Sequence, residues 1–463
     1  MHCIPLVLLL AWPLAAAPLR LHPDNPHYFE YHGRPEIIVT SGEHYGAVIN
    51  SDFDFAKYLD TLKRDGMNAT RTFSGAYCEN PGAFKIEKNT LAPASALLCP
   101  WARSTEAGYA GGGNKFDLTK WDPAYFARLT DFVAQAEKRN IIVEFTLFCP
   151  FYDDAVWALS PQNVRNNVNG IGTVPRDRIY TLDQHGGLLS VHESLTRKLV
   201  TELNRFDNLI LEICNEPYFG GVTEAWQHRI ADVIVETEKS LPKQHLISQN
   251  IANHKARVVN PHPAVRVFNF HYAFLPETVT LNYGLNRVIG DNETGFKGTA
   301  DAHYRMEAWA FLLNGGALFN HLDYSFAVGH EDGTFAYPST QPGGGSATLR
   351  RQLRDLAGFL RSFDFVKMRP APDAVKIKPP GKRHTFCLTE PGRQHASYTT
   401  GPAKGLTLTV EIPASRYSGF WLDPVTGNRQ EIPVFHHAGG PLSLPMPDFP
   451  DGAALKLCAV SGG

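Results

Sequence analysis

The chain has 463 residues, of which 43% are hydrophobic and 19% are charged, with a formal net charge of −2. This length suits a large α/β barrel with a small added module better than one ordinary compact domain, and the composition is that of a folded globular protein. The nearly neutral charge argues against nucleic acid or acidic lipid as the main partner.

The chain opens with a short apolar segment, residues 4–17, that runs into small residues. The segment is too short to span a membrane, and no later stretch approaches the roughly 20 apolar residues that a spanning helix needs. Its length and its small-residue end are typical of a secretory signal peptide, with cleavage after Ala15 or Ala16. We therefore expect residues 1–17 to be a signal peptide and the mature protein to be secreted or periplasmic, without membrane insertion.

Strand and helix patterns alternate from Pro35 to Phe365. Short apolar runs indicate buried parallel strands, and stretches with one apolar face indicate helices between most of them, including 191–206, 223–240, 302–313 and 349–365. The expected strands are 36–41, 67–73, 141–148, 209–216, 245–249, 265–271, 287–293 and 317–324. A long excursion, residues 74–120, follows the second strand, and the helices after strands five and six must be short or missing. This order predicts an α/β fold, a (β/α)₈ TIM barrel over residues 18–368.

The pattern changes after residue 368. Short β-prone runs at 385–388, 406–412, 419–422 and 454–460 alternate with turns rich in Pro, Gly and Asn. They predict a small all-β sandwich domain over residues 369–463. This segment carries no acidic pair and no metal-ligand cluster, so support of the barrel is a better interpretation than carbohydrate binding.

The cysteines do not form a recognisable framework. Six of the seven lie beyond the apolar N-terminal segment, and they are too scattered for a disulfide scaffold and lack zinc-site spacing. Export nevertheless raises the hypothesis of a disulfide between Cys387 and Cys458, in the first and last predicted strands of the β-domain. Cys78 and Cys99 are the other possible pair.

Two of the predicted barrel strands end in a glutamate. The run 209–214 leads into Asn215-Glu216-Pro217, and the run 287–292 leads into Glu293. In a (β/α)₈ barrel such strand ends meet at one rim, where the working groups lie. Two carboxyl groups facing each other are what glycoside cleavage needs, since one protonates the leaving oxygen and the other faces the anomeric carbon. Each motif alone fits a simple strand end equally well, but together they predict a glycosidase.

Further polar and aromatic residues fall at the same predicted rim: Arg71 on strand two, His271 and Tyr272 on strand six, and Tyr324 on strand eight. The Asn-Ala-Thr-Arg71 strand, Asn-Glu-Pro, the His of strand six and the terminal Glu of strand seven together resemble the cellulase-like group of glycoside hydrolase clan A, around family 5. The resemblance covers residues 35–365, and the β-domain is similar to the small sandwich that follows the barrel in several bacterial relatives.

The resemblance implies a role for each matching residue. It implies Glu216 as acid/base, Glu293 as nucleophile, Asn215 as the residue that holds the sugar 2-hydroxyl and Arg71 as the partner of the nucleophile. A carboxylate near a guanidinium stays ionised, whereas one that faces the sugar in a drier pocket can hold its proton to higher pH. The implied chemistry is retaining double displacement, and it needs no cofactor.

The chain departs from the family pattern at two strands. Relatives often carry His-x-Tyr on strand six, but His271 and Tyr272 are adjacent, so one of them is expected to point away from the pocket, with His271 favoured as the lining residue. Tyr324 stands where relatives often carry a Trp that floors the sugar site. The first strand ends in Glu43-His44-Tyr45, and this segment, with Glu43 and His44 as the assigned residues, is a candidate for binding the non-reducing end of a sugar.

Two other acids share strand parity with the predicted pair, Glu212 and Asp291, and both are better interpreted as paired structural acids than as catalytic groups. The 19 histidines could indicate a metal-dependent barrel hydrolase. However, no His-x-His ends the first strand, so no metal ligand is assigned.

The predicted function is a secreted retaining glycoside hydrolase that cleaves β-linked oligosaccharide or polysaccharide. A transglycosidase on the same fold and a non-catalytic carbohydrate-binding protein are the alternatives, and the presence of both glutamates argues against the second. The sugar and the linkage do not follow from the sequence. The excursion at 74–120 could wall off one end of the cleft, which slightly favours exo action or action on short substrates.

Overall fold

A computed structural model describes residues 17–460. The expected signal peptide lies outside this range except for its last residue, so its assignment stays a prediction. Within residues 17–460, no helix combines the length and the apolar character needed to cross a membrane.

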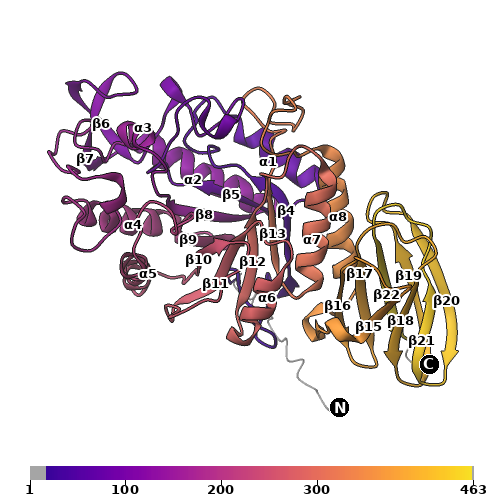
Figure 1. Cartoon of the computed structure of the whole chain (residues 1–463). Helices are drawn as coiled ribbons and strands as arrows, with labels where there is room; N and C mark the ends of the chain where they lie inside the picture. The colour runs from indigo at the N-terminus through magenta and orange to yellow at the C-terminus, as the bar shows by residue number, and fades with distance from the viewer. Residues whose placement is uncertain (1–16, 461–463) are drawn as a thin grey trace, which may run out of the picture.

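Eight parallel strands close into the expected barrel, in the order β10-β11-β12-β13-β4-β5-β8-β9 (Figure 1). Nearly every residue of these strands is buried, as expected for strands that face side chains inside the barrel and helices outside it. The strands are β4 (Ile38–Glu43), β5 (Ala69–Phe73), β8 (Ile142–Phe148), β9 (Leu209–Cys214), β10 (Leu246–Asn253), β11 (Val265–His271), β12 (Val288–Glu293) and β13 (Leu318–Leu322). The (β/α)₈ prediction is confirmed.

The helices pack outside the strands. Four of the longer ones begin at a polar residue whose side chain accepts a hydrogen bond from the first turn, namely Asp54, Asp122, Thr223 and Ser346. Residues 254–264 join β10 to β11 without a helix and only a six-residue helix follows β11, as expected. The helices are α1 (Phe55–Asp65), α2 (Pro123–Lys138), α3 (Asp154–Leu159), α4 (Leu189–Leu203), α5 (Glu224–Glu238), α6 (Glu277–Asn282), α7 (Asp301–Leu313) and α8 (Ala347–Arg361).

Smaller elements complete the barrel part of the chain. A three-stranded sheet precedes the first barrel strand, and the excursion at 74–120 contains a β-hairpin. These strands are β1 (Arg20–Leu21), β2 (Phe29–Tyr31), β3 (Arg34–Glu36), β6 (Trp101–Ala107) and β7 (Asn114–Trp121). Short 3₁₀ helices cover Ala83–Lys85, Ala94–Ala96, Arg176–Arg178, Tyr283–Leu285, Phe365–Lys367 and Pro372–Ala374.

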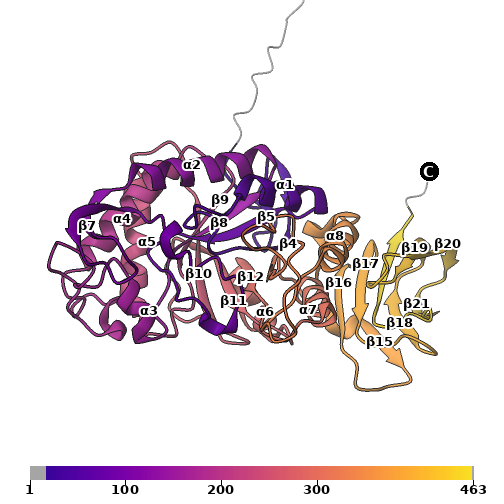
Figure 2. The same ribbon diagram turned by 90° about the horizontal axis from the view of Figure 1, so that it is seen from above.

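The C-terminal part forms two antiparallel sheets, in the orders β14-β16-β17-β22-β19-β20 and β15-β18-β21. Figure 2 shows α7 and α8 between the barrel and these sheets. Trp309 of α7 contacts Tyr398 of the larger sheet, with 5.3 Å between ring centroids. The strands are β14 (Arg369–Pro370), β15 (Val375–Lys378), β16 (Thr385–Glu390), β17 (Gln394–Thr399), β18 (Thr407–Ile412), β19 (Ser415–Leu422), β20 (Arg429–His437), β21 (Gly440–Pro445) and β22 (Ala453–Ala459). The sandwich prediction is confirmed.

The proposed disulfides are absent from the described chain. Strand β17 lies between β16 and β22, where Cys387 is paired with Ser397 and Cys458 with Gln394, so the two cysteines are more than two strand spacings apart, which is about 10 Å or more. A disulfide needs Cα atoms within about 7 Å. The Cys387–Cys458 hypothesis is therefore wrong, and Cys78 and Cys99 are also free thiols.

Candidate active site

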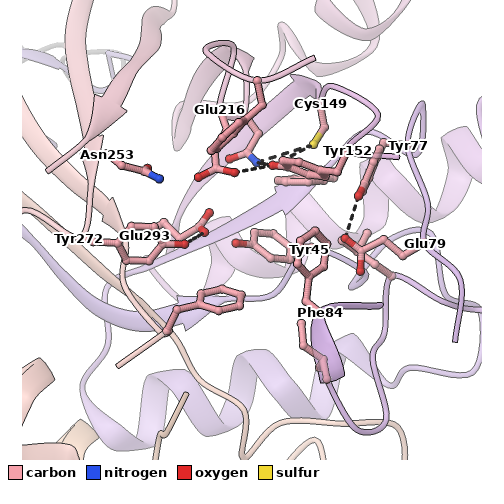
Figure 3. A pocket seen from close by; sticks show the side chains of 16 residues that line it. Tyr45, Tyr77, Glu79, Phe84, Cys149, Tyr152, Glu216, Asn253, Tyr272 and Glu293 are labelled. Carbon is pink, nitrogen blue, oxygen red and sulfur yellow. Dashed lines mark hydrogen bonds between the residues drawn. The ribbon is translucent and has the colours of Figure 1, made fainter. Parts of the chain in front are cut away.

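Glu216 and Glu293 face each other at the C-terminal mouth of the barrel (Figure 3). Glu216 follows β9, and Glu293 is the last residue of β12. His271, at the end of β11, contacts both, since its Nδ1 lies 3.3 Å from Glu216 Oε1 and 3.5 Å from Glu293 Oε2. One oxygen of each carboxylate and a ring nitrogen of His271 all lie within 4.8 Å of one another. The structure thus brings together two carboxyl groups that the sequence placed on separate strands.

Glu216 has an unusual backbone conformation and several hydrogen-bond donors. Its φ is +36°, a left-handed value that a non-glycine residue rarely adopts away from functional sites. Its carboxylate accepts hydrogen bonds from the hydroxyls of Tyr152 (2.6 Å) and Tyr218 (3.2 Å). Burial raises the pKa of Glu216, but these hydrogen bonds and the adjacent His271 outweigh burial, so the pKa is lowered overall. This is the opposite of the raised pKa expected for an acid in a dry pocket.

Arg71 lies at the centre of a buried charge network beneath the pair. Its side chain is fully buried on β5. The guanidinium donates to Glu293 Oε2 (3.2 Å), to Glu212 Oε2 (2.6 and 2.9 Å), to Asn215 Oδ1 (2.6 Å) and to Glu43. The expected contact between Arg71 and Glu293 is present, and Glu212 is the paired structural acid that the strand parity indicated. One planar cation therefore fixes the positions of three carboxylates and one amide.

His271 contacts both glutamates and Tyr272 contacts Glu293, so the expectation that one of the two points away is wrong. Only Tyr272 lines the pocket, whereas His271, the favoured lining residue, does not. Tyr272 donates a hydrogen bond from its hydroxyl to Glu293 Oε1. The physical reason is its φ of +54°, which turns the chain just after β11 and breaks the alternation of a regular strand. As a result, Glu293 receives hydrogen bonds from both Arg71 and Tyr272, which fix the orientation of its carboxylate.

Glu43 and His44 do not line the pocket, contrary to expectation. Glu43 points into the barrel and bonds to Arg71. His44 is buried against Phe53, with 4.2 Å between the ring centroids. Both side chains are occupied by packing and ion pairing, and the lining residue of this strand end is the next one, Tyr45.

Half of the residues that line the pocket are aromatic, and the pocket encloses about 370 Å³. Tyr324, the expected floor of the sugar site, is buried behind the pocket wall and contacts Phe296, with 6.3 Å between ring centroids. The lining rings are Tyr45, Phe73, Tyr77, Phe84, Tyr152, Phe219, Tyr272 and Phe296. Phe84, Phe219 and Phe296 are 36–44% exposed, so they form the open rim.

The polar residues at the site that were not identified from the sequence include Tyr152, Tyr218, Asn253 and Glu79. Tyr152 could have been found, because it follows the third barrel strand within four residues. Asn253 lies at the end of β10, which extends beyond the predicted end at 249, and Tyr218 donates a hydrogen bond to it. Glu79 lies in the irregular excursion at 74–120, where no periodicity indicates which side chains face inward.

Comparison with known proteins identifies relatives only at the level of structure. No protein-family model and no curated protein matches the chain. A candidate glycoside hydrolase from Bacteroides vulgatus ATCC 8482 matches with a TM-score of 0.68 and 15% identity, over 96% of this chain and 83% of its own. A glycoside hydrolase family 5 structure from the same organism matches with a TM-score of 0.63 and 12% identity, over 96% and 93%.

A third solved structure, a glycoside hydrolase family 5 mannosidase from Rhizomucor miehei, matches with a TM-score of 0.50 and 13% identity, over 75% of this chain and 98% of its own. At such low identities these similarities establish the fold. The expected structural resemblance to family 5 glycoside hydrolases is thereby confirmed, and the first two matches extend over the C-terminal sheets as well as the barrel.

Proposed function

We propose that the protein is a glycoside hydrolase of the family 5 type that cleaves β-glycosidic bonds with retention of configuration. The observation that carries the proposal is the facing pair Glu216 and Glu293, with an oxygen of each within 4.8 Å of the other. Retaining enzymes hold these carboxyl groups about 5–5.5 Å apart, whereas inverting enzymes leave roughly 6.5–9.5 Å for a water molecule. The short separation supports retention, and the fold shared with glycoside hydrolase structures supports the reaction class.

In the proposed mechanism the two glutamates act in turn. Glu293, held in place by hydrogen bonds from Arg71 and Tyr272, attacks the anomeric carbon while Glu216 protonates the leaving oxygen. Formation of the glycosyl-enzyme removes the negative charge of Glu293, which makes the proton of Glu216 easier to lose. Glu216 then takes a proton from the water that hydrolyses the intermediate, and the sugar leaves with its original configuration.

One observation favours a metal-dependent hydrolase instead. Glu216, His271 and Glu293 lie close enough to hold a metal ion. The guanidinium of Arg71, 3.2 Å from Glu293, would repel a cation bound there, so the two-carboxylate mechanism is the better supported. Dialysis against a chelator should leave turnover unchanged, and a loss that divalent metal restores would favour the rival.

The test of the proposal is a panel of aryl β-glycosides, with the product anomer followed by NMR in the first minutes of hydrolysis. We expect at least one glycoside to be cleaved and its β-anomer to appear first. An inverted product would contradict the mechanism, and transfer of the sugar to an added acceptor in preference to water would indicate a transglycosidase. Failure to cleave any β-glycoside or β-linked polysaccharide would contradict the function.

Replacing Tyr152 by phenylalanine should move the pH profile upward. Tyr152 donates a 2.6 Å hydrogen bond to Glu216, and this contact lowers the pKa of Glu216. Without it the pKa of Glu216 rises, so the acid stays protonated to higher pH and the alkaline limb of kcat/KM shifts to higher pH. The matched control is Tyr218→Phe, whose longer contact of 3.2 Å should give a smaller shift in the same direction. If the pH profile is unchanged in both variants, the alkaline limb does not report the ionisation of Glu216.

A further inference from the structure

The pocket contains a third carboxyl group, Glu79, that double displacement does not use. Its side chain lines the pocket, and the residue is only 7% exposed. Tyr77 donates a hydrogen bond to Oε1 (2.9 Å) and Asn89 donates one to Oε2. Among the described residues that line the pocket there is no lysine or arginine, so no cation there neutralises this carboxyl group.

A carboxyl group that is buried without a neighbouring cation costs free energy to ionise. Burial raises the pKa of Glu79 to about 7, although the hydrogen bonds from Asn89 and Tyr77 oppose the rise. Burial of an uncompensated charge is avoided elsewhere in proteins, and such groups cluster at functional sites. The alternative is a structural role, in which Glu79 only holds Tyr77 and Asn89 in place within the excursion.

The segment that carries Glu79 is fixed to the barrel. The backbone N–H of Glu79 donates to the carbonyl of Leu91 (2.8 Å). Thr90 packs so closely on Gly46, after β4, that a Cβ on Gly46 would lie 2.3 Å from the Thr90 carbonyl oxygen. The carboxyl group therefore has a defined position, as a group that recognises a ligand requires.

Glu79 lies across the pocket from the catalytic pair. Figure 3 shows Tyr45 between Glu79 and Glu293. The two acids are within electrostatic reach, because the charge of Glu293 contributes to the raised pKa of Glu79. The pocket volume of about 370 Å³ is near the lower end of the roughly 300–1,000 Å³ of ligand sites, which suits a short occupant. A sugar ring held next to Glu293 would thus have its far side directed toward Glu79.

We propose that Glu79 is a specificity-determining residue, which accepts hydrogen bonds from hydroxyl groups on the side of the sugar ring remote from the scissile bond. An ionised carboxylate offers about four lone-pair positions, and protein donors occupy two of them here. Three carboxyl groups, Glu79, Glu216 and Glu293, line the same pocket. The substrate class is therefore a neutral glycoside with free hydroxyls, and uronic acids and sulfated sugars are rejected by charge repulsion. This inference rests on the proposed glycosidase function.

The test compares the best aryl β-glycoside of the panel with its monodeoxy analogues, each lacking one ring hydroxyl, in the wild type and in Glu79→Gln. We expect one or two analogues to lose roughly 10- to 100-fold in kcat/KM with the wild type, the range of a hydrogen bond to a charged group. In Glu79→Gln and Glu79→Ala, kcat/KM for the parent glycoside should fall. The same deoxy analogues should then have kcat/KM values only slightly below that of the parent glycoside. The matched control is Glu87→Gln, which changes an exposed acid of the same segment and should keep the wild-type selectivity.

The outcomes separate this inference from the proposed function. Wild-type selectivity retained in both Glu79 variants, or a β-glucuronide cleaved better than the matching β-glucoside, would overturn the inference and leave the glycosidase proposal standing. If the wild type cleaves no glycoside, the proposed function fails. In that case, calorimetric titration with the monosaccharides of the tested glycosides shows whether Glu79 binds a sugar. Binding that weakens about tenfold in Glu79→Gln but not in Glu87→Gln would support the role of Glu79. Absence of binding would overturn it.

Discussion

Replacing Glu293 by alanine is expected to lower kcat/KM by more than about 10⁴-fold, beyond what a single general acid or base usually contributes. The reason is that the covalent intermediate can no longer form. Azide should restore part of the activity, because a small anion can attack from the side that the carboxylate occupied. The product should then be a glycosyl azide of inverted configuration, which NMR identifies directly.

The companion variant, Glu216→Ala, should behave differently with each leaving group. Substrates with good leaving groups need little protonation, so their first step should be spared, whereas poor leaving groups should lose roughly 10²–10⁴-fold. Azide should attack the glycosyl-enzyme and give the azide of retained configuration. Glu87→Ala, at an exposed acid of the 74–120 excursion, serves as the control and should behave as the wild type. The same products with the two variants exchanged would reverse the assignment of acid and nucleophile.

The barrel could be predicted because its strands are buried on both faces, and such strands have continuous runs of apolar residues in the sequence. The C-terminal sheets were predicted less completely, since β14, β15, β17, β20 and β21 were missed. Strand β20 (Arg429–His437) is an edge strand, mostly exposed and carrying charged residues, so it lacks the apolar pattern. Strand β21 (Gly440–Pro445) contains two prolines, which indicate turns unless the strand is known to lie at an edge.

The site could be predicted where a side chain lies at or near the end of a regular strand. This rule found Glu293, the last residue of β12, and Arg71, two residues before the end of β5. It failed where the backbone leaves the regular alternation. The pairing of β11 with β12 shifts register before Glu293, so the parity argument fails for Asp291 and Asn292. The amide of Asn292 reaches Glu212 inside the barrel (2.8 Å). Asp291 is not the ion-paired acid that parity suggested, because burial and the charge of Glu307 on α7 raise its pKa. Local φ values and bulges leave no trace in a hydrophobicity pattern.

Replacing Arg71 by alanine should damage both activity and stability. The sequence alone places Arg71 at an open strand end, where the fold would tolerate its loss. The structure changes this expectation, because the guanidinium is fully buried and contacts the carboxylates of Glu43, Glu212 and Glu293. Removing one partner of a buried ion pair costs about 3–5 kcal/mol, and we expect the free energy of unfolding to fall by about that amount. Arg71→Lys should rescue little, since a single ammonium group cannot reproduce the planar fork.

The loss of stability in Arg71→Ala should also depend on pH, and the titration of Glu43 determines whether this loss increases or decreases with pH. Burial and the charge of Glu293 raise the pKa of Glu43 above its ordinary value of 4.5, while Arg71 opposes the rise. Without Arg71 the pKa of Glu43 in the folded state rises further. Between pH 4.5 and this raised pKa, Glu43 is protonated in the folded state but ionised in the unfolded state. The stability that this difference contributes is therefore lost as the pH rises from 4.5 through the folded-state pKa. The deficit relative to the wild type should therefore be smaller at about pH 5 than at about pH 8, as urea unfolding can measure.

A second buried arginine separates the two effects of this substitution. Arg350 is also fully buried and pairs with Asp65 and Asp323, and its ion pairs include neither Glu216 nor Glu293. Arg350→Ala should lose a similar amount of stability, while its folded fraction keeps wild-type turnover of an aryl β-glycoside. The folded fraction of Arg71→Ala should instead lose at least about 10²-fold in turnover, because Glu293 loses the guanidinium that orients its carboxylate. Near-normal turnover per folded molecule in Arg71→Ala would remove Arg71 from the catalytic site and leave it a purely structural residue.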